Sequence, residues 1–313
     1  MKRKALFTGG GGSGAEAIYR YLSPKYDLYF GDCDTEKINP VIPSHRTIKL
    51  PWASDPTFTS QVQRICNELS IDFLIPSVDE ELLTLASSFE QFTTRLILPL
   101  PSFVETMLDK LKMIEALLAE SILVPKTLLF DSDFSSLAFP CICKPRVGRG
   151  SRDITYLHSR NEALKFRDFL SFSSNPSLFI IQECAKGVEY TVQMIADSEA
   201  CLQAVLPVEI AVKKGITIDA RINKNPAVVN ACQAIHDRIP TPGIYNIQLI
   251  LTSDGRVFPF EINPRISTTF CLALAAGLDP LEVFDTNLSS PKTILDYADN
   301  LRIQRFWNNQ ISV

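Results

Sequence analysis

The pattern of the sequence changes near residue 100, and this change restricts the folds that the chain can adopt. Over the first hundred residues, short apolar runs alternate with helical segments, which predicts right-handed crossovers and a mostly parallel, doubly wound sheet. Between residues 139 and 263 β-like runs dominate, which predicts an antiparallel-rich α+β region. We therefore expect an α/β, Rossmann-like domain over residues 1–104 and an α+β domain over residues 105–313.

The expected elements follow these runs. In the N-terminal region we predict strands at Ala5–Thr8, Tyr26–Phe30, Phe73–Pro76 and Leu96–Leu98, and helices at about Ala15–Leu22, Thr57–Leu69 and Glu80–Phe89. Met107–Glu120 is predicted to be one helix, because its apolar residues have amphipathic spacing. Later strands are predicted at Cys141–Lys144, Ile154–Leu157, Phe179–Gln182, Tyr190–Ile195, Ala204–Val208, Ile244–Leu251 and Val257–Ile262, with a terminal strand near Ile303–Trp307.

Composition and charge argue against several classes of protein. Hydrophobic residues make up 46% of the 313 residues and charged residues 21%, as in an ordinary soluble globular protein. The net charge of −4 supplies no basic surface for nucleic acid. No apolar run approaches the roughly 20 residues that cross a bilayer. The apolar stretch after the basic N-terminus ends at Thr8, which is too early for a signal peptide. We expect neither nucleic-acid nor membrane partners.

The eight cysteines are scattered, and none has the paired CxxC spacing of a zinc site. Cys141 and Cys143 are two residues apart, so in a strand they share one face and are predicted to be core residues. Free thiols in a chain of this length favour a reducing compartment, so we expect a cytoplasmic protein.

Gly9–Gly14 contains the pattern GxGxxG between a strand and a helix, and Asp32 ends the next strand. This is the arrangement of a dinucleotide-binding fingerprint. A stretch so rich in glycine matches the pattern almost by default, so we favour a tight strand-to-helix turn without a dinucleotide. The sequence GxxxxGK[ST] does not occur, which excludes a classical P-loop.

Asp254-Gly255 lies between two apolar runs and predicts a two-residue hairpin turn. Directly opposed residues point to the same side of a hairpin. With Asp254-Gly255 in the turn, Ser253 faces Arg256, Gln248 faces Glu261 and Asn246 faces Asn263. The opposite, apolar face carries Ile247, Leu249, Phe260 and Ile262 and is predicted to face the core.

The polar face of this hairpin is a candidate metal site. A carboxylate beside amide oxygens is the hard, oxygen-rich set of ligands that Mg²⁺ or Mn²⁺ prefers. The alternative is a solvated outer face of an edge hairpin, for which Thr, Lys and Glu are more usual than Asn and Gln. We favour the metal site.

Several segments, in order along the chain, resemble the ATP-grasp family, in particular the type represented by carbamoyl phosphate synthetase and the pyrrolysine-biosynthesis ligase. The sequence Glu261-Ile262-Asn263-Pro264-Arg265 resembles the metal-binding motif of that family. The other matching segments are 78–81, which resembles the end of the N-terminal domain; 109–112 and 122–127, which resemble the opening of the ATP-grasp region; 139–146 with 148–151, which resemble the lid strand and phosphate loop; and 181–190, which resembles the adenine linker.

The resemblance implies a role for each matched residue. Lys144 and Lys110 would contact phosphates, and Gly148, Gly150 and Ser151 would cover the γ-phosphate. Glu183, with the backbone of Cys184 and Ala185, would read the adenine, and Glu189 would bind the ribose hydroxyls. Gln248, Glu261 and Asn263 would hold Mg²⁺ or Mn²⁺, and Arg265 would act with Lys144 in catalysis by stabilising the transferred phosphoryl group. Several members of the family have a second acid at this place. This chain has Gln248 there instead, as does the carbamoyl phosphate synthetase type.

The resemblance also implies a Rossmann-like pre-ATP-grasp domain, followed by an ATP-grasp domain with a lid over about residues 113–182. The implied activity joins a small-molecule carboxylate to an amine or another nucleophile, through an acyl phosphate, with release of ADP and phosphate. The chain is too short for two synthetase halves, so carbamoyl phosphate synthesis by this chain alone is not expected. An NAD(P)-dependent oxidoreductase, a non-catalytic ATP-binding protein and a homodimer stay open.

Overall fold

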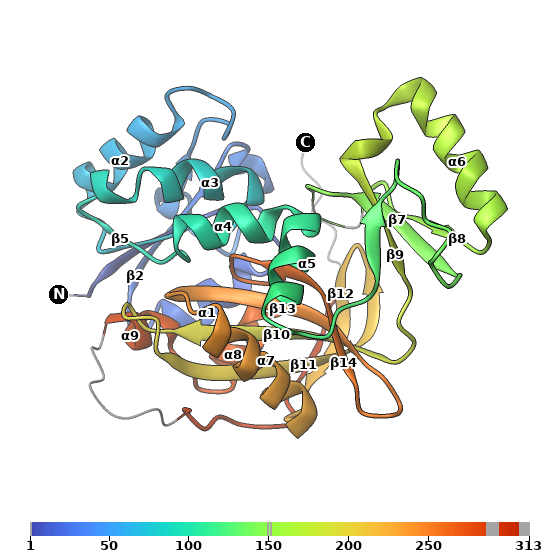
Figure 1. Cartoon of the computed structure of the whole chain (residues 1–313). Helices are drawn as coiled ribbons and strands as arrows, with labels where there is room; N and C mark the ends of the chain where they lie inside the picture. The colour runs from blue at the N-terminus through green and yellow to red at the C-terminus, as the bar shows by residue number, and fades with distance from the viewer. Residues whose placement is uncertain (1, 149, 151, 286–293, 307–313) are drawn as a thin grey trace.

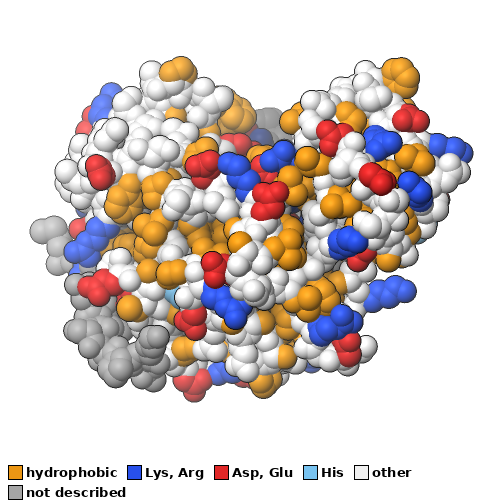
Figure 2. Space-filling model, viewed as in Figure 1, with side chains coloured by type: hydrophobic (Ala, Val, Ile, Leu, Met, Phe, Trp, Pro, Cys, Tyr) orange, Lys and Arg blue, Asp and Glu red, His pale blue; other side chains and the backbone are white. Residues whose placement is uncertain are grey.

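The computed structural model describes residues 2–148, 150, 152–285 and 294–306. These residues form three sheets: a five-stranded sheet, a four-stranded sheet and a six-stranded sheet. In Figure 1 the five-stranded N-terminal domain (blue and cyan) and the four-stranded lid (green) both lie over the six-stranded sheet (yellow to red). The space-filling view shows the surface hollowed between the N-terminal domain and the lid (Figure 2). The expected combination of an α/β domain with an antiparallel α+β region is confirmed.

The N-terminal sheet is parallel throughout, with strand order β3-β2-β1-β4-β5. Apolar side chains point to both faces of β1; those on one face pack against α1, and those on the other pack against α2 and α3. The sequence did not predict β3, which has three residues. The elements are β1 Lys4–Thr8, α1 Ala15–Leu22, β2 Asp27–Asp32, β3 Thr47–Lys49, α2 Phe58–Leu69, β4 Phe73–Ile75, α3 Asp79–Ser87 and β5 Arg95–Leu96.

The helix predicted over Met107–Glu120 is wrong, because the structure has two helices there: α4 Pro101–Leu108 and α5 Lys110–Ala119. Asp109 separates them with an extended backbone, and its carboxylate accepts from the N–H groups of Leu111 and Lys112. An aspartate in this position is an N-cap, which starts a new helix and ends the preceding one. The amphipathic spacing is common to both helices, so periodicity alone could not reveal the break.

The six-stranded sheet is antiparallel, with strand order β14-β13-β10-β11-β12-β15. One face packs on α5 and α7, and the other packs on α8, α9 and the N-terminal domain. Strands β10, β11, β13 and β14 are longer than predicted, and β12 was not predicted. Trp307 of the predicted terminal strand lies outside the described residues. The elements are β10 Val188–Ala196, β11 Leu202–Lys214, β12 Ile216–Ile222, α7 Pro226–Arg238, β13 Gly243–Leu251, β14 Val257–Asn263, α8 Phe270–Ala275, α9 Pro280–Asp285 and β15 Arg302–Gln304.

The lid is an antiparallel sheet in the order β6-β9-β7-β8, covered on one face by α6. Cys141 and Cys143 are fully buried in this small core, as predicted, and all eight cysteines are free thiols. The lid elements are β6 Thr127–Leu129, β7 Cys141–Pro145, β8 Thr155–Leu157, α6 Arg160–Ser173 and β9 Phe179–Glu183. Short 3-10 turns occur at Thr35–Lys37, Ser44–Arg46, Phe89–Gln91 and Pro176–Leu178.

The hairpin of β13 and β14 has the predicted pairing at its far end and a different turn. Gln248 pairs with Glu261, and Asn246 pairs with Asn263, as expected. The two-residue turn is wrong, because Leu251 pairs with Val257 and residues 252–256 form the loop. A β-bulge beside Gln248 absorbs the one-residue difference in register.

In the described part of the chain, no helix has both the length and the apolar character needed to cross a membrane. The N-terminal domain and the six-stranded sheet share one apolar core, which joins residues from β1, β2, β11 and α8. The division of the chain after residue 104 stays a prediction.

Candidate active site

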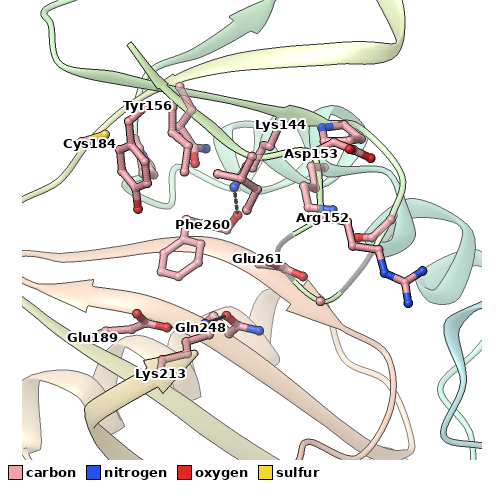
Figure 3. Close-up of a pocket in the computed structure, with 18 of the residues that line it drawn as sticks. Lys144, Arg152, Asp153, Tyr156, Cys184, Glu189, Lys213, Gln248, Phe260 and Glu261 are labelled. Atoms are coloured by element: carbon pink, nitrogen blue, oxygen red, sulfur yellow. Dashed lines mark hydrogen bonds and ion pairs between the residues drawn. The ribbon is translucent and has the colours of Figure 1, made fainter. Parts of the chain in front are cut away.

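A cavity of about 630 Å³ lies between the lid and the six-stranded sheet (Figure 3). Its walls come from β7, β8 and β9 of the lid and from β10, β11, β13 and β14 of the large sheet. Most of the predicted site residues line it: Lys110, Lys144, Gly148, Gly150, Glu183, Cys184, Ala185, Glu189, Gln248 and Glu261. Asn263 and Arg265 lie next to this set without lining the cavity, and Ser151 lies outside the described residues.

Lys144 is a buried cation in the roof of the cavity. It follows the apolar strand run of β7, and 4% of the residue is exposed. Its Nζ donates to the carbonyl oxygen of Phe260 at 3.3 Å and lies 5.3 Å from the centre of the Phe260 ring. None of the described carboxylates forms an ion pair with it. Burial lowers the pKa of Lys144 to about 8, although the negative charge of Glu261 opposes this shift.

Lys110 begins α5 and is also buried, with 7% of the residue exposed. Its Nζ donates to the carbonyl oxygen of Gly148 at 2.8 Å, so Lys110 contacts the predicted phosphate loop. Gly148 and Gly150 have φ angles of 140° and 71°, which glycine adopts without strain. The loop conformation therefore depends on glycine at both positions.

The predicted adenine segment follows β9 along the cavity. The side chain of Glu183 accepts from the N–H of Ala138 at 2.7 Å, so its carboxylate is used within the lid. Cys184 donates its N–H to Pro140. Glu183, Cys184 and Ala185 all line the cavity.

Glu189 and Gln248 are joined by a lysine that sequence reasoning missed. Lys213 Nζ lies 2.6 Å from Glu189 Oε1 and 2.9 Å from Gln248 Oε1 (Figure 3). Lys213 comes from β11, which does not neighbour β13 in the sheet. A lysine near the end of a strand usually faces solvent, so the sequence carries no signal for this contact.

The predicted metal ligands supply the right donor atoms. Glu261 and Gln248 face the cavity from paired positions on β14 and β13. Asn263 donates its Nδ2 to Asn246 Oδ1 at 3.2 Å, which leaves the Asn263 side-chain oxygen without a described partner. The Glu261 carboxylate and the Asn263 amide oxygen suit Mg²⁺, which keeps waters and takes its remaining ligands from phosphates. The Gln248 oxygen accepts from Lys213 Nζ, so it would join this set only after that bond breaks. Among the described residues, no three His, Cys, Asp or Glu side chains lie close enough together to bind one metal ion.

Arg265 follows this set and forms an ion pair with Asp79 at the start of α3. Its Nη1 also donates to the carbonyl oxygen of Ile266 at 3.0 Å. The side chains of Arg265 and Asp79 are 16% and 13% exposed. The pair connects the end of the metal-binding segment with the N-terminal domain.

The bulge in the hairpin explains a second correction. Phe260 was predicted to face the core with Ile262, but it lines the cavity beside Lys144. The extra residue of a bulge breaks the alternation of side chains along the strand. Tyr156 from β8 and Glu80 from α3 also line the cavity and were not predicted.

In the glycine loop, three backbone N–H groups already have acceptors within the loop or in β2. The N–H groups of Gly10, Gly11 and Gly12 donate to Gly31 O, Asp32 Oδ2 and Gly9 O, each at 2.9 Å. Asp32, which a dinucleotide fingerprint would assign to a ribose, therefore holds the loop closed. This geometry favours the tight turn and weighs against an NAD(P) site.

The comparison with family models agrees with the geometry of the cavity. The model of the ATP-grasp domain matches residues 107–269, which is more than half of the chain. The protein therefore belongs to the ATP-grasp family, whose members are ATP-dependent ligases that use Mg²⁺. No curated protein sequence matches the chain.

Solved structures share this fold at low sequence identity. The L-amino acid ligase from Bacillus licheniformis has a TM-score of 0.67 and 15% identity, over 90% of this chain and 72% of that one. The N5-carboxyaminoimidazole synthetase from Staphylococcus aureus, complexed with ADP, has a TM-score of 0.68 and 15% identity, over 88% and 74%. The biotin carboxylase domain of Hydrogenobacter thermophilus 2-oxoglutarate carboxylase, in complex with MgADP and bicarbonate, has a TM-score of 0.67 and 11% identity, over 90% and 69%.

Proposed function

We propose that this protein is a carboxylate–amine ligase that binds MgATP in the cavity and forms an acyl phosphate, with release of ADP and phosphate. The observation that carries the proposal is the arrangement of charges across the cavity. Lys144 lies on strand β7 of the lid, and Lys110 contacts Gly148 of the lid loop from the start of α5. Glu261 and Gln248 lie on the wall formed by the six-stranded sheet. A polyphosphate between these walls would neutralise the buried lysines, while a metal ion would join its oxygens to Glu261.

The proposed roles follow these positions. Lys144 and Lys110 bind the phosphates, and Gly148 and Gly150 cover the γ-phosphate. The resemblance alone assigns Ser151 to the same role, because this residue lies outside the described part of the chain. The backbone after Glu183, through Cys184 and Ala185, reads the adenine, and Glu189 binds the ribose. Gln248, Glu261 and Asn263 hold Mg²⁺, which supplies neutralisation of the charge on the phosphate oxygens.

The chemistry needs positioning more than covalent participation by the protein. A carboxylate oxygen of the substrate attacks the γ-phosphorus, the bond to the β–γ bridging oxygen breaks, and ADP leaves. The amine then attacks the acyl carbon and phosphate leaves. Arg265 stabilises the phosphoryl group, and the lid keeps out the water that would hydrolyse the intermediate.

Within the family, we infer the type represented by carbamoyl phosphate synthetase and the pyrrolysine-biosynthesis ligase. The support is Gln248 opposite Glu261, which leaves a single carboxylate in the proposed metal set. The carboxylate and amine substrates are small molecules, and candidate pairs can be found by an ADP-release screen.

The nucleotide product tests the proposal directly. With an active carboxylate and hydroxylamine in place of the amine, the protein should release ADP and phosphate and accumulate a hydroxamate. The matched control is Glu261→Gln, which should fold normally and lose this turnover because the proposed metal set loses its carboxylate. AMP and pyrophosphate as products, or unchanged turnover in Glu261→Gln, would contradict the proposal.

A further inference from the structure

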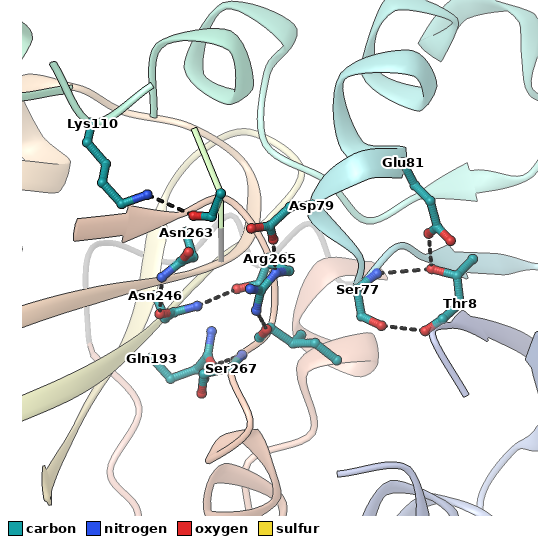
Figure 4. Close-up of polar contacts among 12 residues, drawn as sticks. Thr8, Ser77, Asp79, Glu81, Lys110, Gln193, Asn246, Asn263, Arg265 and Ser267 are labelled. Carbon is teal, nitrogen blue, oxygen red and sulfur yellow. Dashed lines mark hydrogen bonds and ion pairs between the residues drawn. The ribbon is translucent and has the colours of Figure 1, made fainter. Parts of the chain in front are cut away.

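Asp79 lies outside the cavity but contacts the residue proposed to stabilise the phosphoryl group. Its carboxylate accepts from Nε of Arg265, which is 186 positions away in the sequence (Figure 4). The two side chains are largely buried; Asp79 begins α3 of the N-terminal domain, and Arg265 follows β14 of the six-stranded sheet. The pair therefore joins the N-terminal domain to the segment that follows β14.

The contacts of Arg265 fix one side of its guanidinium and leave the other available. Nε is held by Asp79, and Nη1 donates to Ile266 O. No described residue accepts from Nη2. The backbone of Arg265 is fixed as well, because its carbonyl oxygen accepts from Asn246 Nδ2 at 2.9 Å. An arginine held in this way has already lost much of its rotamer freedom before a ligand arrives.

Asp79 is itself held in place by the N-terminal domain. It is the first residue of α3, where a carboxylate interacts favourably with the helix dipole. Ser77, two residues before Asp79, makes two hydrogen bonds to Thr8 at the end of β1. Ser77 N donates to Thr8 Oγ1 at 3.0 Å, and Ser77 Oγ donates to Thr8 O. Two residues after it, Glu81 accepts from Thr8 Oγ1. The position of Asp79 is thus fixed to the end of β1.

We propose that Asp79 is a positioning residue for phosphoryl transfer, which holds Arg265 so that its Nη2 edge can bind the phosphoryl group as it leaves ATP. This inference rests on the proposed function, since it needs a phosphoryl group beside Arg265. The N-terminal domain then contributes to catalysis through Asp79, even though its glycine loop does not line the cavity. Loss of Asp79 leaves Arg265 free to adopt other rotamers and weakens its contact in the transition state.

The test uses a mimic of the phosphoryl group, so it does not need the natural carboxylate. The dissociation constant of MgADP is measured by calorimetry with and without aluminium fluoride, which imitates a phosphoryl group in transfer. We expect aluminium fluoride to tighten MgADP binding to the wild-type protein. Asp79→Asn should reduce this tightening about tenfold or more, with little change in the dissociation constant of MgADP alone. Asp79→Glu, which keeps the charge, should recover part of the tightening.

A matched control distinguishes positioning from general domain docking. Asp279 also joins the N-terminal domain to the rest of the chain, because its Oδ2 lies 3.0 Å from Lys25 Nζ and its side chain is 10% exposed. Neither residue lines the cavity. Asp279→Asn should therefore lower the unfolding midpoint about as much as Asp79→Asn does, and should leave the tightening by aluminium fluoride intact.

The outcomes separate the two proposals. Tightening that persists unchanged in Asp79→Asn, or that is lost equally in Asp279→Asn, overturns the role of Asp79 alone. A wild-type protein that binds MgADP without any tightening by aluminium fluoride overturns the proposed phosphoryl transfer, and the role of Asp79 falls with it.

Discussion

At the scale of single residues, Lys144 is a buried amine in the cavity whose charge is costly to maintain. No carboxylate among the residues that the structure describes forms an ion pair with this buried amine, and burial lowers its pKa from 10.5 to about 8. At about 1.4 kcal/mol per unit of pKa, this corresponds to a cost of about 3 kcal/mol for keeping the buried amine charged. The unfolded chain binds this proton more tightly, so the cost is present below pH 8 and disappears as the pH rises toward 10.5. A bound polyphosphate would place negative charge beside the amine and so offset this cost.

Binding of MgATP should therefore depend on pH through Lys144. Above pH 8 the amine must take up a proton to bind phosphate, so the affinity should fall by up to about tenfold per pH unit. Calorimetry between pH 7 and 9.5 measures this dependence. Lys144→Met should bind more weakly at pH 7, by about 1.5–3 kcal/mol, and should lack the dependence. An equally steep pH dependence in Lys144→Met would show that another group is responsible.

At the scale of elements, the hairpin and the glycine loop show how local backbone geometry decides the position of side chains. The bulge in the hairpin moves Phe260 into the cavity while Gln248 and Glu261 stay opposed. In the glycine loop, each glycine has a different surrounding. A Cβ on Gly9 would lie 2.7 Å from Val78 Cγ2, and its φ angle is 63°. A Cβ on Gly14 would have no neighbour closer than 4.0 Å.

Single alanine substitutions in the glycine loop should therefore differ. Gly9→Ala should lower the free energy of unfolding by about 1–3 kcal/mol, because it adds both strain and a clash. Gly14→Ala should lower it by about 1 kcal/mol or less, because Gly14 is the N-cap of α1, a position that favours glycine over alanine, and no clash is added. Both variants should bind MgATP with nearly wild-type affinity, since the loop does not line the cavity. Urea unfolding and calorimetry measure the two quantities. A selective loss of MgATP binding in a stably folded Gly14→Ala protein would place the loop in the nucleotide site.

At the scale of the whole molecule, Arg305 connects three segments near the end of the described chain. Its guanidinium donates to Thr217 O at 3.0 Å and to Ser13 O at 2.6 Å, and also to Thr268 O. These carbonyls belong to the start of β12, the glycine loop and the segment that precedes α8. A planar guanidinium with several fixed donors can satisfy three such acceptors at once, which a lysine cannot.

Arg305→Ala should loosen the contact between the N-terminal domain and the large sheet. We expect a loss of about 1–3 kcal/mol in the free energy of unfolding, because carbonyl groups lose their donor. Arg305→Lys should recover less than half of this loss, since one ammonium cannot reach all three carbonyls. MgATP affinity serves as the control and should stay unchanged in both variants. Urea unfolding with an unchanged midpoint in Arg305→Ala would show that these bonds contribute no net stability.

Much of the fold could be predicted from local sequence, because strand and helix periodicity is set by residues that are close in the chain. The alternation in the first hundred residues gave the parallel sheet, and the apolar runs after residue 139 gave the antiparallel strands. The predicted pairing of Gln248 with Glu261 and of Asn246 with Asn263 is confirmed, although it was based on a two-residue turn that is wrong, because the bulge beside Gln248 restores the register. The break at Asp109 did not, since an N-cap inside an amphipathic pattern resembles any other polar position.

The sequence by itself determined the residue types of the candidate site, namely two lysines, the carboxylate of the proposed metal set and amide oxygens in a fixed order. The tertiary structure decided which of them meet. Lys213 reaches Glu189 and Gln248 from β11, and Asp79 reaches Arg265 from the N-terminal domain. The Lys213 contacts span three strands of one sheet, and the Asp79 contact depends on how the N-terminal domain packs on the rest of the molecule. No local pattern encodes either arrangement. The same physical reason explains Phe260, whose direction is set by a bulge that forms when the loop and the far pairs of the hairpin fix different registers.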